Sequence, residues 1–108
     1  MKGTLYDLDP GPETPKVVRM IVEIPKHSTN KYEYDKDLGV FRLDRPLYSP
    51  VHYPGDYGFV PGTLAPDGDA VDVLALVEKP SFPGCLVMNM VGESDQKILA
   101  VPSHCPVF

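Results

Sequence analysis

The sequence has few cysteines and no long apolar run. Its two cysteines, Cys85 and Cys105, do not share a CxxC-type spacing, and two are too few for a disulfide scaffold in a chain of 108 residues. No apolar run reaches the roughly 18 residues that span a membrane. The N-terminus also lacks the basic region and apolar stretch of a secretory signal. These absences predict a cytoplasmic protein.

An excess of basic charge is also missing. The chain carries 10 Lys and Arg residues against 15 Asp and Glu residues, a formal net charge of -5. Binding to a nucleic acid or an anionic membrane needs a basic stripe, so neither is expected as a partner. Local basic residues remain available to bind a phosphate.

Uninterrupted windows of helical length are scarce, because 13 prolines are scattered through the chain. Prolines at this density separate short strands, and the class is therefore predicted to be mainly β. Residues 1–16, rich in proline, glycine and polar residues, are expected to form an extended N-terminal arm. Residues 17–108 are long enough for one core and are expected to form a single domain.

Two apolar segments predict strands of the core. Residues 17–25 alternate with period two, and a carboxylate, Glu23, interrupts one face. Residues 71–77 are apolar apart from Asp72 and predict a central strand covered on both faces. Residues 52–59, between these strands, are aromatic and rich in turn residues.

A hairpin is predicted from residues 31–35 and 40–44, which flank a turn that contains a glycine. Alternation places Lys31, Glu33 and Asp35 on one face as a charged stripe. Two more short segments, at residues 85–91 and 98–101, bring the expected number of strands to six or seven. Strands this short and this regularly spaced favour a barrel or a sandwich.

The densest chemical signal is a group of three carboxylates within six residues, Asp67, Asp69 and Asp72. A hairpin turn is the simpler explanation for the first two, since Asp-Gly is a favoured turn sequence. Asp72 lies inside the predicted strand, where an unpaired carboxylate is costly to bury. A cation or hydrogen-bond donors are therefore expected beside it.

Magnesium is the expected cation, because it binds through a few carboxylates and keeps waters that phosphate oxygens can replace. Soft metals prefer Cys and His ligands, which this segment lacks. A calcium EF-hand loop is excluded, because its sixth position requires glycine and counting from Asp67 places Asp72 there.

Residues 67–73 resemble the Asp-x-Asp-Pro-x-Asp-x signature of the family I soluble inorganic pyrophosphatases, with Ala70 in place of the usual proline or glutamate. Other segments similar to the family occur in its order and at almost its spacing; they are residues 22–25, 31–33, 43–45, 53–58, 62–64 and 97–102. The resemblance covers most of the chain from residue 17 onward. It implies a small antiparallel OB-like β-barrel.

The resemblance also implies an activity and a site. The activity is hydrolysis of inorganic diphosphate to two phosphates by a metal-activated water, with Mg2+ or possible Mn2+ as cofactor. The metal-binding residues that it implies are Asp67, Asp72, Asp95 and Glu23, and Asp69 matches the aspartate that helps to deprotonate the water. The substrate-binding residues that it implies are Lys31, Arg45, Tyr57 and Lys97, with Glu33 and Tyr53 around them.

Each of these residues also has a simpler explanation. Lys31 and Arg45 are typical solvated surface charges, Tyr53 and Tyr57 are typical core or turn aromatics, and Glu23 could pair with a neighbouring base. Only the occurrence of all these residues together, in the family's order, favours a functional role over the simpler explanations. The reaction needs the same kinds of group, because diphosphate is highly charged and the attacking water must lose a proton.

Two departures from the family pattern leave an alternative open. Gly92 stands where family members place a metal-binding aspartate, and the chain ends at Phe108, before the family's Tyr-Lys contact and long helix. The alternative is an impaired or inactive remnant that binds metal or phosphate, or only self-associates. The barrel is expected to be incomplete relative to the family, with apolar surface that predicts a homo-oligomer. That surface is expected around Val73, Leu74, Leu76, Met88 and Ile98.

Overall fold

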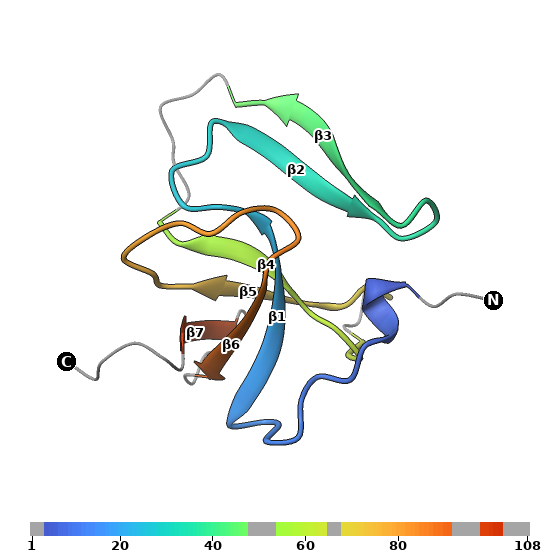
Figure 1. Cartoon of the computed structure of the whole chain (residues 1–108), viewed down its shortest axis with the longest axis vertical. Coiled ribbons are helices and arrows are strands. Elements are labelled where there is room, and N and C mark those ends of the chain that lie inside the picture. Colours follow the sequence, from blue (N-terminus) through green and yellow to red (C-terminus); the bar gives the residue numbers. More distant parts are fainter. Residues whose placement is uncertain (1–3, 48–53, 65–67, 92–97, 103–108) are drawn as a thin grey trace.

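The computed structural model describes residues 4–47, 54–64, 68–91 and 98–102, the last of these for the backbone only. It contains seven strands and one turn of 3-10 helix, so the predicted mainly-β class is confirmed (Figure 1). None of the described helical residues forms a segment long and apolar enough to cross a membrane. In chain order the elements are η1 (Leu5–Asp7), β1 (Val17–Ile24), β2 (Asn30–Asp35), β3 (Val40–Pro46), β4 (Asp56–Val60), β5 (Val71–Ala75), β6 (Leu86–Val91) and β7 (Ile98–Pro102).

Five strands pair in a ring of order β1-β4-β5-β7-β6, in which β6 returns to β1. This is the five-stranded barrel expected of an OB-like fold. Four of the pairings are antiparallel, and the departure from a purely antiparallel barrel is the parallel pairing of β5 with β7. The ring closes within the described strands, so the unpaired barrel edge expected from the sequence is not found there.

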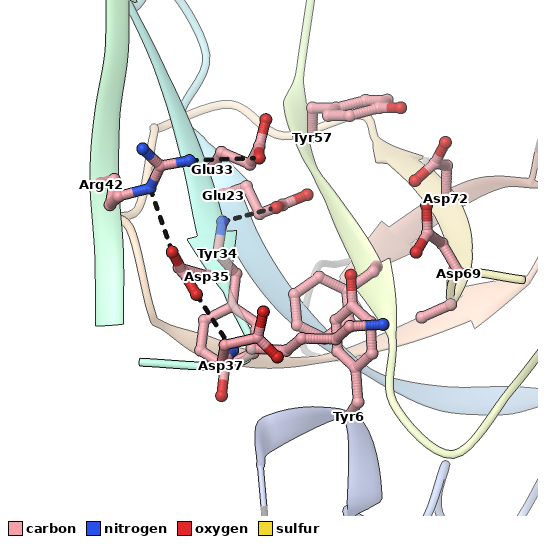
Figure 2. Close-up of a pocket in the computed structure, with 13 residues that line it drawn as sticks. Tyr6, Glu23, Glu33, Tyr34, Asp35, Asp37, Arg42, Tyr57, Asp69 and Asp72 are labelled. Atoms are coloured by element: carbon pink, nitrogen blue, oxygen red, sulfur yellow. Dashed lines mark hydrogen bonds and ion pairs between the residues drawn. The ribbon is translucent and has the colours of Figure 1, made fainter. Parts of the chain in front are cut away.

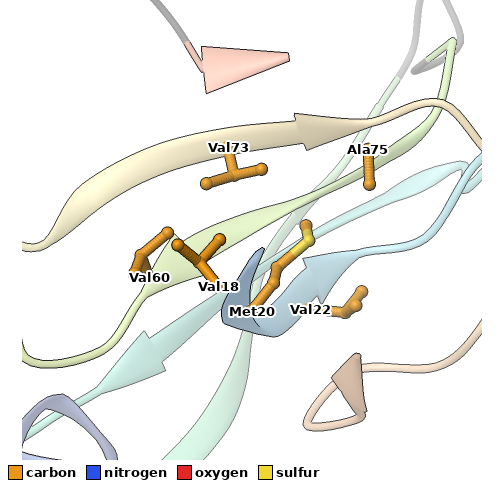
Figure 3. Packing of buried hydrophobic residues seen from close by; sticks show 6 residues of the cluster. All are labelled: Val18, Met20, Val22, Val60, Val73 and Ala75. Carbon is orange, nitrogen blue, oxygen red and sulfur yellow. The ribbon is translucent and has the colours of Figure 1, made fainter. Parts of the chain in front are cut away.

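The barrel interior holds an apolar core that alternate residues of the strands supply. Val18, Met20 and Val22 of β1 face inward and meet side chains from β4 and β5 (Figure 3). Burial of such side chains is worth about 1.5–3 kcal/mol each, before the entropy of ordering them is subtracted. Period-two alternation along β1 therefore sets which residues lie inside the ring.

Strand β4 was not predicted, because its sequence is rich in turn residues. Asp56–Val60 nevertheless pairs with β1 on one side and β5 on the other. Gly58 makes this possible, since a Cβ added there would overlap the carbonyl oxygen of Ile21. A glycine inside a strand often marks such a close approach of two backbones.

The β2-β3 hairpin forms a separate two-stranded sheet that lies against the outside of the barrel (Figure 1). Tyr34 anchors it, because its buried ring packs with Ile21, Phe59 and Ala70 in a second apolar cluster. The Tyr34 and Phe59 ring centroids are 5.7 Å apart. This apolar contact holds the hairpin against the barrel wall, and polar side chains beside the contact line a space between the two.

Strand β5 differs from the expectation of a strand covered on both faces. Val73 and Ala75 are buried in the barrel, whereas Asp72 on the opposite face is exposed. The carboxylate of Asp72 therefore bears no burial cost, and the prediction that it is buried was wrong. Val73 also does not belong to an exposed apolar surface, because its side chain is fully enclosed.

The described N-terminal residues, from Thr4 onward, lie against the barrel. The N–H of Gly62 donates a hydrogen bond to the Tyr6 carbonyl at 2.7 Å, and the N–H of Arg19 donates to the Pro10 carbonyl at 2.7 Å. Thr4 caps η1 in a capping box with Asp7. The division into an arm of residues 1–16 and a barrel domain of residues 17–108 stays a prediction.

Replacing Gly58 with alanine should lower the free energy of unfolding by about 3 kcal/mol, because the added methyl group must push β1 and β4 apart. Urea unfolding followed by circular dichroism measures this change. Gly39→Ala is the matched control: nothing lies within 4 Å of an added Cβ there, and only its φ of 74° disfavours a side chain. The control should cost about 1 kcal/mol. Equal losses for the two variants would contradict the close-approach explanation.

Candidate active site

A pocket of about 440 Å³ lies between the hairpin, the barrel wall and η1 (Figure 2). Its volume is in the range of small-molecule sites. Most of its polar lining is acidic. The residues that line it are Tyr6, Glu23, Glu33, Tyr34, Asp35, Lys36, Asp37, Arg42, Tyr57, Phe59, Asp69, Ala70 and Asp72.

Four of the residues predicted for the site meet in this pocket: Glu23, Tyr57, Asp69 and Asp72. They come from β1, from β4, from the loop before β5 and from β5 itself. Glu33, predicted to surround the site, lines the pocket as well. Figure 2 shows Asp69 and Asp72 across the cavity from Glu23 and Glu33. The predicted residues Asp67, Asp95, Lys97 and Tyr53 lie outside the described part of the chain.

Lys31 and Arg45 do not line the pocket. They oppose each other at one end of the β2-β3 hairpin, where Lys31 forms an ion pair with Asp44 at 3.8 Å. The positive charge of Lys31 still favours the ionised form of Glu23 and so acts to lower the pKa of that carboxyl. Lys31 therefore stands within electrostatic range of the pocket.

Glu23 is the carboxyl group that the pocket perturbs most. Burial, with smaller contributions from the charges of Asp72 and Glu33, raises its pKa to about 7. The N–H of Tyr34 donates a hydrogen bond to Glu23 Oε2 at 2.9 Å and opposes this rise. In the absence of a cation, Glu23 thus holds a proton up to neutral pH.

Tyr6 experiences the same negative field. Burial, followed by the charges of Glu23, Asp69, Asp72 and Glu33, raises the pKa of its phenol to about 12. The sequence analysis missed Tyr6, because it assigned the first 16 residues to an extended arm. The pairing of Thr4 with Asp7 at capping-box spacing was the signal that could have indicated an ordered turn there.

On the hairpin side of the pocket, an arginine forms ion pairs with two of the carboxylates. Arg42 forms ion pairs with Glu33 at 3.8 Å and with Asp35 at 3.3 Å. These contacts were also missed, although Glu33 and Arg42 oppose each other in the hairpin register. The arginine lies on the hairpin, whereas the barrel side brings the three carboxylates of Glu23, Asp69 and Asp72 to the pocket.

The donor set on the barrel side fits a hard divalent cation, because all its charged groups are carboxylates. The raised pKa of Glu23 shows that this charge is costly without a counterion. Within the described ranges, no three His, Cys, Asp or Glu side chains come together in an arrangement that could hold a metal ion. Magnesium is commonly bound through one or two carboxylates together with waters and phosphates, so a smaller set is sufficient.

The sequence and the structure both resemble known proteins. The family model of inorganic pyrophosphatases matches residues 20–108. The inorganic pyrophosphatase of Halalkalibacterium halodurans is 52% identical over 103 residues, which cover 87% of this chain and 63% of that protein. The inorganic pyrophosphatase of Halobacterium salinarum is 49% identical over 117 residues, covering 100% of this chain and 66% of that protein.

A solved structure gives the same result. The crystal structure of inorganic pyrophosphatase from Thermus thermophilus superposes with a TM-score of 0.89 at 43% identity, over 94% of this chain and 64% of that one. The chain thus spans slightly less than two thirds of the length of these relatives. The family match and these identities agree with the motif order and with the barrel, and the chain belongs to the inorganic pyrophosphatase family.

Proposed function

We propose that the chain performs Mg2+-dependent hydrolysis of inorganic diphosphate to two phosphates by attack of water. The observation that carries this proposal is the meeting of Glu23, Asp69 and Asp72, from separate segments, in one pocket. Diphosphate and these carboxylates repel each other, so a divalent cation is needed between them. Mn2+, which also prefers oxygen ligands, is the alternative cation.

The residues proposed to hold the cation are Asp67, Asp72, Asp95 and Glu23. Of these, Glu23 and Asp72 lie in the described pocket, and the charge of Asp72 disfavours ionisation of Glu23. A bound divalent cation supplies positive charge to the phosphoryl oxygens and lowers the pKa of a water. Family members carry one more metal aspartate, so we expect weaker binding than in the full pattern.

The remaining roles belong to the chain's own side chains. Asp69 is proposed to accept the proton of the attacking water, and its exposed position in the pocket supports this role. Tyr57, from β4, is proposed to hold a phosphate group from the same pocket. Lys31, Arg45 and Lys97 are proposed to supply positive charge to the phosphates.

The second candidate is a remnant that binds metal or phosphate without turnover. It is favoured by Gly92, which stands in the sequence where family members place a metal-binding aspartate. Turnover separates the two candidates, because a remnant binds magnesium or phosphate and releases no product.

Replacing Asp69 with asparagine should lower the rate of phosphate release by about 100-fold or more, because the amide cannot accept the proton. A colorimetric phosphate assay with magnesium and diphosphate measures the rate. Asp9→Asn is the matched control, since Asp9 is exposed on the arm and its Oδ1 only accepts a hydrogen bond from Gly11.

The control should keep the rate of the unmodified chain. If the unmodified chain releases phosphate and Asp69→Asn releases it at the same rate, the proposed role of Asp69 is contradicted. No release by the unmodified chain, together with magnesium binding, would favour the remnant.

The free energy of unfolding of the metal-free chain should fall as the pH rises from about 4.5 through about 7. The folded chain raises the pKa of Glu23 above its ordinary value of 4.5, so it binds the proton more tightly than the unfolded chain does. The stabilisation is therefore complete below pH 4.5 and is lost above pH 7. Its size is at most about 3.5 kcal/mol, since the two pKa values differ by about 2.5 and one pKa unit corresponds to about 1.4 kcal/mol.

Urea unfolding at a series of pH values, without metal, measures this change. Glu23→Gln should remove the decline between the two pKa values, whereas the exposed control Glu78→Gln should keep it. Magnesium added at pH 8 should restabilise the unmodified chain more than Glu23→Gln. An unchanged decline in Glu23→Gln would show that another group is responsible.

We also propose that the chain self-associates into a homo-oligomer. Leu86 and Met90 lie on one outward face of β6 and are 51% and 38% exposed, and Phe82 nearby in sequence is 64% exposed. Contiguous apolar side chains on a surface are typical of an interface. The cytoplasmic location stays a prediction.

Light scattering should give a mass above 11.9 kDa at high concentration, and Leu86→Lys should shift it toward the monomer. Leu38→Lys is the matched control, because Leu38 is also exposed, at 69%, but lies in the hairpin turn. A monomer at every concentration would refute self-association.

A further inference from the structure

Tyr6 differs from the other pocket residues because it comes from the first residues of the chain. Its ring packs edge-on against Phe59, with centroids 4.8 Å apart, and lies 5.6 Å from the ring of Tyr34. Its carbonyl accepts a hydrogen bond from Gly62 at 2.7 Å. The backbone and the ring of Tyr6 are therefore both held in place.

The hydroxyl of Tyr6 has no part in this packing. Figure 2 shows the side chain directed from η1 into the pocket, toward the carboxylates of the barrel side. A phenylalanine ring would fill the same space beside Phe59 and Tyr34. The hydroxyl is a neutral hydrogen-bond donor among carboxylates, which can only accept when ionised.

A positive charge accompanies this donor. The ammonium group of Lys36 lies 5.7 Å from the centroid of the Tyr6 ring, and Lys36 also lines the pocket. A neutral donor and a cation in a pocket lined mostly by carboxylates suit an anionic group there. The simpler explanation is a hydroxyl that only contacts water, and the two are separable by ligand binding.

We propose that the Tyr6 hydroxyl is a substrate-binding group of the site and donates a hydrogen bond to a phosphate oxygen of bound diphosphate. This inference rests on the proposed function. A phenol keeps its proton at neutral pH, as a donor must, and burial raises the pKa of this one further.

The position of Tyr6 depends on Gly62, on the loop that follows β4. A Cβ added to Gly62 would lie 2.6 Å from the carbonyl oxygen of Leu8 and 2.7 Å from Pro10 Cδ. The φ of 69° at Gly62 also disfavours any side chain. Gly62→Ala should therefore displace the first residues from the barrel, and Tyr6 with them, without changing a pocket side chain.

Calorimetry with methylenediphosphonate, an uncleavable diphosphate analogue, in the presence of magnesium tests the role of the hydroxyl. Tyr6→Phe should weaken binding by about tenfold, because one hydrogen bond to a charged group is lost. Its thermal unfolding midpoint should stay unchanged. Tyr32→Phe is the matched control, since its hydroxyl accepts a hydrogen bond only from Asn30 at 3.2 Å, outside the pocket.

Binding by Tyr6→Phe equal to that of the unmodified chain would overturn the inference, whether or not the chain hydrolyses diphosphate. Analogue binding that depends on Tyr6, without phosphate release, would support the inference and refute hydrolysis. A chain that does not bind the analogue at all would overturn both.

Gly62→Ala supplies an independent test. It should weaken binding of the analogue by a similar factor, and adding Tyr6→Phe to it should cause little further loss, because both changes remove the same contact. If the losses of binding caused by the two substitutions add in full, the hydroxyl does not act from the position that the contact with Gly62 fixes. That result would overturn the inference.

Discussion

The burial of β1 on both faces is the constraint on which the rest of the structure depends. Met20 and its inward neighbours fill the barrel, while Ile21 on the opposite face packs beneath the hairpin. Period-two alternation then places Glu23 on the hairpin side as well, where the N–H of Tyr34 reaches it. A single strand thus closes the barrel with β4 and β6, seats the hairpin and delivers a carboxylate to the pocket.

The pocket concentrates negative charge at a cost in stability. A surface built only for stability would pair each carboxylate, as the hairpin does with Arg42. On the barrel side burial, followed by the charges of neighbouring carboxylates, instead raises the pKa of Glu23 to about 7 and that of Tyr6 to about 12. The divalent cation that we propose for this pocket would supply positive charge beside Glu23 and Asp72 and so offset this cost.

The sequence predicts what depends on local alternation and misses what depends on contacts between distant segments. Strands β1, β2 and β3 follow from period-two patterns and a glycine turn. Strand β4 does not, because Gly58 serves an approach to Ile21 that no local pattern shows. The exposure of Asp72 was also missed, since an apolar run does not reveal that one face of the strand opens onto a pocket. Tyr6 reaches the site only through bonds such as that from Gly62.

Asp56 and Glu23 are two carboxylates of the same fold that have different surroundings. Asp56 is only 2% exposed, yet it accepts hydrogen bonds from the N–H of Lys26 at 2.8 Å and from the hydroxyl of Ser81 at 2.7 Å, as well as from the N–H of Ser81. Its charge is satisfied, and it joins the segment after β1 to the loop before β6. Glu23 is only partly buried and lines the pocket, where the N–H of Tyr34 donates to one of its oxygens and the charges of Asp72 and Glu33 add to the rise of its pKa. A carboxyl group perturbed in this way inside a pocket is typical of functional sites.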